Sequence, residues 1–440
     1  MAVMPLEMAP AGMPANAASS VTERRLHPAL VITVALFFLW GMANNLNDIL
    51  IAQFRKAFTL SDFGTSFVQQ VFYLGYFLFA IPASMMLRRY GYKAGIVTGL
   101  LLYGGGALLF YPAALASAYQ LFLAALFVIA AGLAFLETSA NPLMTEFGDP
   151  ATAARRLNWA QAANPLGAIT GILIGRNFIL SGIEHDERTL ATMGEAARSA
   201  FYKAEVQAVA TPYVVIAIVV LLFAAAAALV SFPGSSTHGG HDGQTGSFRD
   251  ILRRPRVVGA MAAQFFYVGA QVGLWSFTIR YAQANVGMAE RSGADALFVS
   301  LLLFSTGRFL GTALMARVPP VRLLAIFAAV SLALAIVAGT IGGRIGLYAM
   351  VSASFFMSIQ FPTIFALGVE GLGSLRRVGS SLIIMTIIGG AALTALMGLV
   401  SDLAGIATAM LVPAFGFAVV MAFAIWCIRT READQFRELS

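Results

Sequence analysis

The sequence predicts an all-α membrane protein with twelve transmembrane helices in two pseudo-symmetric halves of six. Three observations carry this prediction. Of the 440 residues, 59% are hydrophobic and only 11% are charged, whereas soluble domains carry about 25% charged residues. Apolar segments recur at the length of about 20 residues that a helix needs to cross the hydrocarbon core. A polar linker divides these segments into two equal groups.

The composition excludes several classes of protein. So few charges cannot cover a water-soluble surface, which excludes a soluble enzyme, a nucleic-acid binder and a disordered chain. The net charge of +7 is therefore interpreted as loop charge at a membrane surface, and no nucleic-acid partner is expected. The single cysteine, Cys427, excludes a disulfide framework, and all four histidines fall outside the apolar segments. No metal site and no cofactor is expected.

Breaks at charges, glycine and proline delimit the twelve spans. They are expected near residues 30–52, 66–87, 94–115, 120–144, 157–180, 211–232, 257–281, 296–316, 321–340, 345–369, 378–400 and 406–428. The domain organisation that follows is a cytoplasmic tail (1–27), a first six-helix half (28–232), a Gly- and Ser-rich cytoplasmic linker (233–255), a second half (256–430) and a second cytoplasmic tail (431–440).

A short internal repeat supports the two halves. Arg155 opens a basic pair at the start of the fifth span, and Arg376 opens one at the eleventh, 221 residues later. Pro142 of the fourth span and Pro362 of the tenth are 220 residues apart. Two six-helix halves related by an axis along the membrane normal are typical of the major facilitator class.

The basic residues predict the orientation. Eighteen of the 28 Lys and Arg residues fall in loops on the side of the N-terminus, and nine fall on the opposite side. Because basic loops stay in the cytoplasm, we expect a multi-pass protein with both termini cytoplasmic. The external loop 181–210 is acidic, and its segment from Glu195 to Glu205 is expected to form a polar surface helix.

Polar side chains within the spans gather on a few helix faces. A carboxylate at the bilayer centre costs at least ~2.5 kcal/mol on insertion scales, so one that remains should face water, a partner or a substrate. Residues four apart share a helix face, which predicts one shared cavity. Its candidate residues are Trp40, Asn44, Asn45 and Asp48 in the first span, Glu137 and Asn141 in the fourth, Gln161 and Asn164 in the fifth, and Gln264, Tyr267, Gln271 and Trp275 in the seventh.

This residue set favours an uncharged polyhydroxy solute such as a sugar. Asn and Gln both donate and accept hydrogen bonds, and Trp stacks on the C–H face of a sugar ring. Arg280 and Arg308 are interpreted as snorkelling from span ends, so sugar phosphates and organic acids are disfavoured. Two alternatives stay open: the amides hold helices together, and Trp40 and Trp275 belong to an interfacial aromatic belt.

Asp48 and Glu137 are the candidates for proton coupling. A closed apolar cavity favours the neutral carboxyl and access to water favours the charged one, so a carboxyl can link proton movement to alternating access. Glu137 follows an apolar run at 130–136 and is the better proton carrier, while Asp48 is the better joint sugar and proton site. An uncoupled facilitator and a sugar-sensing receptor remain alternatives. An integral membrane enzyme is disfavoured, because no nucleophile or metal cluster is found.

Five segments together resemble the fucose permease family of the major facilitator superfamily. They are F-F-L-W-G-M-A-N-N-L-N-D from Phe37, F-L-E-T-S-A-N-P from Phe135, N-W-A-Q-A-A-N-P-L-G from Asn158, Q-F-F-Y-V-G-A-Q-V-G-L-W-S-F-T-I-R-Y from Gln264 and M-S-I-Q-F-P-T-I-F-A-L-G from Met357. The resemblance extends from about residue 28 to 428.

The resemblance implies a monomeric, proton-coupled symporter of the bacterial inner membrane. Its substrate would be a neutral monosaccharide, L-fucose or a related hexose, with glucose/galactose transport as the alternative. The family's essential carboxyls map onto Asp48 and Glu137, its span-five amides onto Gln161 and Asn164, and its tryptophan onto Trp40. Gln360 and Phe361 of the tenth span complete the expected sugar site.

Two departures from the family pattern matter. Fucose-transporting relatives have Tyr before the P-T-I-F of the tenth span, whereas this chain has Phe361, which removes one hydroxyl and resembles the glucose/galactose branch. The superfamily's loop motif between spans two and three usually has Asp before its Arg. The segment from Leu87 to Gly91, L-R-R-Y-G, lacks it, so we expect a weaker or differently built charge relay at the inner gate.

Overall fold

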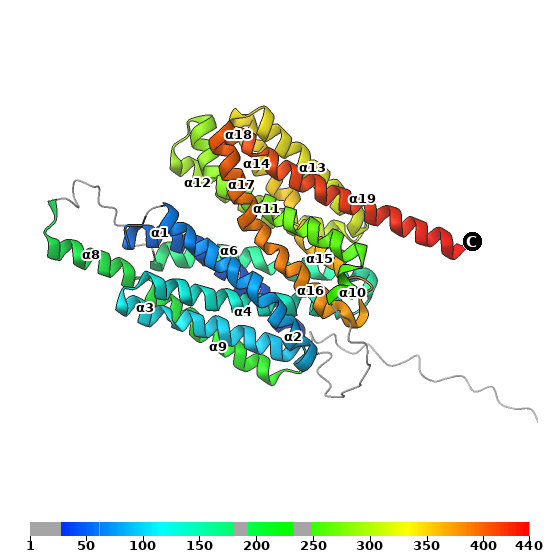
Figure 1. Ribbon diagram of the computed structural model, residues 1–440, viewed down its shortest axis with the longest axis horizontal. Coiled ribbons are helices and arrows are strands. Elements are labelled where there is room, and N and C mark those ends of the chain that lie inside the picture. Colours follow the sequence, from blue (N-terminus) through cyan, green and yellow to red (C-terminus); the bar gives the residue numbers. More distant parts are fainter. Residues whose placement is uncertain (1–27, 61, 180–191, 233–247, 440) are drawn as a thin grey trace, which may run out of the picture.

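The computed structural model describes residues 28–60, 62–179, 192–232 and 248–439. These ranges contain helices and no β-strand. Figure 1 shows two helical bundles side by side, one formed by α1 to α9 and the other by α11 to α19. The predicted tail 1–27 and most of the predicted linker, residues 233–247, lie outside the described residues.

The first bundle contains ten helical elements among the described residues. They are α1 (Pro28–Ala57), α2 (Asp62–Leu108), α3 (Phe110–Ala116), α4 (Tyr119–Glu146), the 3-10 turn η1 (Pro150–Thr152), α5 (Ala153–Gln161), α6 (Ala163–Ile174), the π-turn η2 (Gly175–Ile179) and, beyond a gap, α8 (Glu195–Gln207) followed by α9 (Ala210–Leu229). Helix α2 packs along α4 and α9, and α1 packs along α6.

The second bundle follows the short helix α10 (Phe248–Leu252). It consists of α11 (Pro255–Val286), α12 (Glu290–Leu314), α13 (Pro320–Thr340), α14 (Gly343–Met357), α15 (Gln360–Val369), the 3-10 turn η3 (Gly373–Leu375), α16 (Arg376–Met385), the 3-10 turn η4 (Thr386–Ile388), α17 (Gly389–Ala404), α18 (Ile406–Ala409) and α19 (Leu411–Leu439). Helix α11 packs along α17 and α19, and α13 packs along α14 and α19.

The described ranges contain 10 helical stretches long and apolar enough to cross a membrane, against twelve predicted spans. Two local features explain the difference. The second and third spans run together as Phe67–Ala116, with a turn at Leu109 between α2 and α3. The stretch also kinks at Gly91, whose φ of 81° leaves the helical region and is readily adopted by glycine. The fifth span is divided among α5, α6 and η2, none of which reaches the length of a full span.

The predicted repeat is visible in how the two bundles are packed. A Cβ atom on Gly167 of α6 would lie 1.9 Å from the carbonyl oxygen of Phe38, and one on Gly389 of α17 would lie 2.1 Å from that of Phe265. Both glycines therefore let two helix backbones touch, as small residues do in membrane bundles. Chain breaks also recur, since α5 ends at Gln161 and α16 ends at Met385.

The predicted surface helix of the external loop is α8, and Figure 1 shows it at the end of the molecule opposite α10 and the C-terminal end of α19. One of its acidic residues is not on the surface. Glu205 is only 2% exposed, because its carboxylate accepts a hydrogen bond from Gln53 Nε2 at 2.8 Å and pairs with Lys56 Nζ at 2.9 Å. These contacts fasten α8 to the end of α1.

Candidate functional site

A cavity of about 80 Å³ lies between the two bundles. Ligand sites usually enclose roughly 300–1,000 Å³, so the cavity must widen before it holds a sugar-sized molecule. Seven of the predicted site residues line it: Trp40 and Asn45 of α1, Gln161 of α5, Asn164 of α6, Gln271 and Trp275 of α11, and Phe361 of α15. The other lining residues were not predicted, and Arg308 of α12 is the charged residue among them.

Aromatic rings form two walls of the cavity. The rings of Trp40 and Phe361, from opposite bundles, have centroids 6.1 Å apart. Trp275 packs edge-on against Phe304 at 5.0 Å and donates its indole N–H to Ser354 Oγ at 3.1 Å. Both tryptophans thus lie inside the protein, which favours the sugar-stacking interpretation over the aromatic-belt alternative.

Besides Gln161, three amides face the cavity, and they come from both bundles. Asn45 Nδ2 donates to the carbonyl oxygen of Gly41 at 3.0 Å, and Asn164 Nδ2 donates to that of Phe37 at 3.4 Å, so each amide is held with one donor in use. The Gln271 side chain lines the cavity from α11. Its amide and the oxygens of the two asparagines can serve hydroxyl groups.

The position of Arg308 corrects a sequence-based interpretation. Its side chain does not snorkel to the interface: it is 3% exposed and lines the cavity. Its Nη1 donates to the backbone oxygen of Gln161 at 3.2 Å and to Gln161 Oε1 at 3.1 Å. Among the described side chains, no carboxylate forms an ion pair with it. The cavity therefore contains a cation, and the interpretation of Arg308 as a snorkelling residue at a span end was wrong.

Arg308 begins a hydrogen-bonded chain that leads away from the cavity. Gln161 Nε2 donates to Asn141 Oδ1 at 2.7 Å, and Asn141 Nδ2 donates to the backbone oxygen of Glu137 at 3.0 Å. The chain crosses from α12 of the second bundle to α4 of the first. It connects a buried guanidinium group with the helix turn that carries a buried carboxyl.

Glu137 lies behind the cavity wall, as a buried group. It is 3% exposed, and neither of its carboxyl oxygens has a hydrogen-bond partner within the described residues. The Tyr76 hydroxyl and the Trp40 indole N–H are also buried, and neither has a hydrogen-bond partner in the part of the chain that the structure describes. An ionised carboxylate in such surroundings is costly unless it is paired, so the surroundings favour the protonated form.

The other predicted site residues lie off the cavity surface. Tyr267 donates its hydroxyl to the backbone oxygen of Met357 at 2.8 Å, and Gln360 Nε2 donates to Ser331 Oγ at 3.0 Å. Gln264 is fully buried, with both amide atoms unpartnered among the described residues.

Asn44 is half-buried and is not part of the cavity lining. The side chain of Asp48 lies outside the described residues, so its role as a proton and sugar site stays a prediction. No cluster of three or more His, Cys, Asp or Glu side chains that could hold a metal ion occurs among the described residues.

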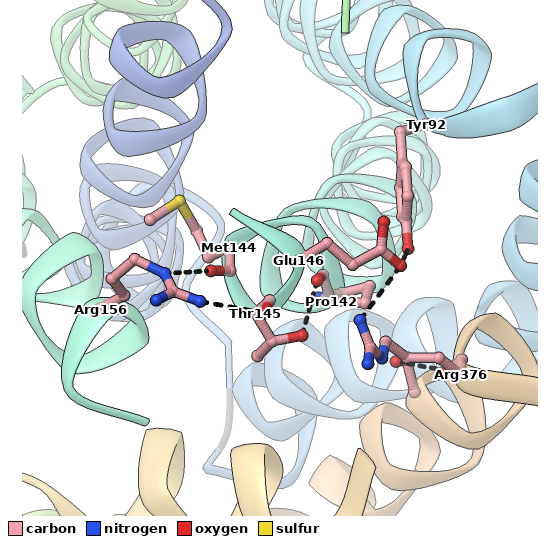
Figure 2. Close-up of polar contacts among 8 residues, drawn as sticks. Tyr92, Pro142, Met144, Thr145, Glu146, Arg156 and Arg376 are labelled. Atoms are coloured by element: carbon pink, nitrogen blue, oxygen red, sulfur yellow. Dashed lines mark hydrogen bonds and ion pairs between the residues drawn. The ribbon is translucent and has the colours of Figure 1, made fainter. Parts of the chain in front are cut away.

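A second layer of contacts joins the bundles at the end of the molecule where α10 lies, and we call it the inner seam. Figure 2 shows its centre, where the Tyr92 hydroxyl donates to Glu146 Oε1 at 2.6 Å and Arg376 Nη1 lies 3.5 Å from the same oxygen. Arg377 Nη1 donates to the backbone oxygen of Leu87 at 2.8 Å. The expected relay without the loop Asp is thus differently built, with Glu146 as its acid.

Two further contacts extend the inner seam. Asn158 Nδ2 of α5 donates to Thr363 Oγ1 of α15 at 3.1 Å. Arg156 remains within the first bundle, where it donates to the backbone oxygens of Met144 at 3.3 Å and Thr145 at 3.1 Å (Figure 2). In the sequence, Arg156 is only the second member of the basic pair that Arg155 opens. Its carbonyl contacts hold the end of α4, which presents Glu146 to the seam.

Comparisons with known proteins agree with this architecture. Residues 30–392 match the family model of the Major Facilitator Superfamily. The chain is 46% identical, over 89% of its length and 91% of the relative, to the L-fucose-proton symporter of Escherichia coli (strain K12). It is 33% identical, over 90% of its length and 93% of the relative, to the glucose/galactose transporter of Brucella abortus biovar 1 (strain 9-941).

A solved structure supports the assignment. The crystal structure of the major facilitator transporter FucP in the outward conformation superposes with a TM-score of 0.83 at 45% identity, covering 90% of this chain and 98% of that one. Identity at this level over nearly the whole length, with the same arrangement of helices, shows that the chain is a transporter and not an enzyme. The chain belongs to the fucose permease family of the major facilitator superfamily.

Proposed function

We propose that this protein imports a neutral monosaccharide together with a proton, by alternating access between the halves 28–232 and 256–430. The observation that carries the proposal is the central cavity, where aromatic rings and amides from both bundles meet in front of the buried Glu137. Apolar ring faces and bifunctional amides match the C–H faces and hydroxyls of a sugar. Names of relatives with nearly full coverage support the same activity.

The proposal includes a location. The protein functions as a monomer in the bacterial inner membrane, with both termini in the cytoplasm, because basic residues concentrate on that side. The inner seam then faces the cytoplasm, and α8 faces outward. In this arrangement the closed inner seam separates the cavity from the cytoplasm, and sugar and proton enter from outside when the cavity widens.

L-fucose or a related hexose is the proposed substrate, with glucose or galactose as the alternative within the family. Phe361 favours the alternative, since it lines the cavity without the hydroxyl expected of a fucose site. Measured uptake rates for L-fucose, D-arabinose, D-galactose, D-glucose and D-mannose would rank these sugars as substrates. Phe361→Tyr should raise the preference for L-fucose, whereas an unchanged ranking would separate the hydroxyl from substrate choice.

Glu137 is the proposed proton carrier, and Asp48 is proposed to bind both proton and sugar. A proton on Glu137 neutralises a charge that the closed cavity cannot solvate, so the loaded carrier can reorient. Arg308 suggests how sugar binding reaches the proton site. Its hydrogen bond to Gln161 continues through Asn141 to the helix turn of Glu137. A sugar hydroxyl that takes over one of these bonds transmits its presence to the proton site.

Sugar-driven alkalinisation of the medium tests the coupling directly. Cells that express the protein should take up protons when the preferred sugar is added, and an uncoupler should stop uphill accumulation. Sugar entry that continues without a pH change and ignores the uncoupler would identify an uncoupled facilitator. Binding without any entry would identify a sugar-sensing receptor.

A further inference from the structure

A second pocket, of about 440 Å³, opens at the inner seam. Its floor is buried and mostly apolar, with Ala154 of α5 and Leu367 of α15 among its members. Its mouth is formed by exposed residues, including Pro150, Pro319 and Gly371. The volume lies within the range of roughly 300–1,000 Å³ that is usual for small-molecule sites, and the pocket is separate from the sugar cavity.

The charged groups around this pocket favour an anion. Arg376 and Arg431 line it, and Arg256 stands beside them, paired with Glu370 at 3.3 Å. Glu370 also pairs with Arg431, and Glu146 pairs with Arg376 at 3.5 Å. Three arginines thus face two glutamates, which leaves one positive charge in excess.

Arg376 keeps hydrogen-bonding capacity in reserve. Its Nε is buried and has no hydrogen-bond partner among the described residues, and its 3.5 Å contact with Glu146 is long for a charge-assisted hydrogen bond. Guanidinium groups bind phosphate through two parallel N–H bonds. A phosphate group would bind Arg376 and Arg431 at the polar side of the pocket. The apolar floor would contact the organic part of the ligand.

The walls of the pocket come from both bundles. Thr145, Pro150 and Ala154 belong to the first, and Pro319 and Arg431 belong to the second. Alternating access moves one bundle against the other around the central site. The pocket is therefore complete only while the inner seam is closed, and a ligand that needs both walls binds that state alone.

We propose that this pocket binds a small organic phosphate from the cytoplasm and that the bound phosphate holds the inner seam closed, which inhibits sugar import. The inference rests on the proposed transport function and orientation. Its energetic basis is differential affinity: a ligand shifts a conformational equilibrium only by binding one state more tightly than the other. Here the second state lacks half of the pocket.

The binding step can be measured without transport, which separates failure of this inference from failure of the proposed function. Purified full-length protein is titrated with glucose 6-phosphate in a thermal-shift assay, with inorganic phosphate in a parallel arm. We expect a saturable rise in melting temperature with glucose 6-phosphate at millimolar concentration. The rise should disappear in Arg431→Gln and persist in Arg253→Gln, which removes an exposed charge outside the pocket.

The inhibition step is measured as sugar counterflow in proteoliposomes with the probe on the cytoplasmic face only. Counterflow should fall several-fold with glucose 6-phosphate and should be insensitive to it in Arg431→Gln. Arg431 and its partner Glu370 lie in the same bundle, so basal counterflow should persist in this variant. Ala151→Trp, which fills the mouth from its exposed side, is a second variant that should remove the inhibition.

Three outcomes would overturn the proposal. Absence of any thermal shift at millimolar probe would mean that the pocket does not bind organic phosphates. An equal shift with inorganic phosphate would reduce it to a simple anion site. Inhibition that survives both Arg431→Gln and Ala151→Trp would place the probe in the sugar cavity instead.

Discussion

The two bundles share their packing but differ in the charge that each one buries. Gly167 in the first and Gly389 in the second press against a neighbouring helix in the same way, and both bundles break a helix soon after the basic pair. The first bundle buries Glu137 without a cation, whereas the second buries Arg308 without a carboxylate among the described residues. The two halves therefore share the backbone packing around the cavity but differ in its buried charged residues, a carboxyl group in the first half and a guanidinium group in the second.

Among the substitutions that test this difference between the halves, Glu137→Gln should have the largest effect on transport. We expect uphill sugar accumulation to be abolished and counterflow exchange to be retained, because an amide fills the space but carries no exchangeable charge. The measurement pairs accumulation with counterflow in the same vesicles. Glu205→Gln is the matched control, since it removes a buried but ion-paired carboxyl of the same half and should leave accumulation intact. Loss of both activities in Glu137→Gln, or of neither, would refute the proton-carrier role.

Arg308 is the counterpart in the second half. Arg308→Gln should weaken sugar binding roughly 10- to 100-fold, as expected when a buried hydrogen bond of a charged group worth about 1.5–3 kcal/mol is lost. Arg308→Met should also raise the melting temperature, because an unpaired buried charge is destabilising. Arg280→Gln, which alters an exposed arginine near the end of α11, should change neither quantity. A full-affinity Arg308→Gln protein would remove this residue from the sugar site.

The shared packing predicts equal effects in the two halves. Gly167→Ala and Gly389→Ala should each lower stability by about 1–3 kcal/mol, because the added methyl group overpacks a backbone contact. Gly105→Ala and Gly398→Ala are controls in open surroundings and should be neutral in the same thermal assay. A loss of stability confined to one half would show that the two contacts are not equivalent.

The smallest expected effect lies at the inner seam, where the halves meet through partly exposed ion pairs. Arg376→Gln should favour opening by about 0–1 kcal/mol, the usual range for an exposed pair. A cysteine introduced at Ala154 in a Cys427→Ala background should then be alkylated up to several-fold faster. Arg280→Gln, a change of an exposed charge near the C-terminal end of α11 and away from the seam, should leave the rate unchanged. Slower alkylation in Arg376→Gln would reverse the assigned role.

Much of the fold could be predicted because hydropathy and loop charge are local properties. The predicted spans coincide with helical stretches of the described chain, although spans 211–232 and 296–316 extend past the ends of α9 and α12 and residue 180 of the fifth span lies outside the described residues. Of the repeat markers, Arg376 begins α16 and Arg155 lies in the first turn of α5. A loop was predicted between the second and third spans, whereas the helix continues through this region with only a kink at Gly91, because a glycine between two apolar runs fits a loop and a kink equally well. The division of the fifth span was missed as well, because its broken turns have the same apolar composition as a continuous helix.

The site could be predicted in part. Stripes at four-residue spacing identified Trp40, Gln271 and Trp275, because a shared helix face is readable from the sequence. Arg308 was missed, although it lies six residues before the end of α12, about 9 Å along the axis. Its burial depends on Gln161, 147 residues away, and no local pattern reports such a contact. The same holds for Glu146, whose partner Arg376 lies in the other bundle.

The break at Gly91 gives the inner seam a property that its ion pairs lack. Leu87 lies in the last helical turn before the break. The carbonyl oxygens of such a turn lack partners within the helix and carry the partial negative charge of the helix dipole. Arg377 of the other bundle supplies the cation and the N–H that this end requires. One half thus serves as the C-cap of a helix in the other, so opening the seam leaves a helix terminus to be capped by water. The ease of opening should then depend on hydration at that terminus, and cosolvents that withdraw water should keep the protein closed.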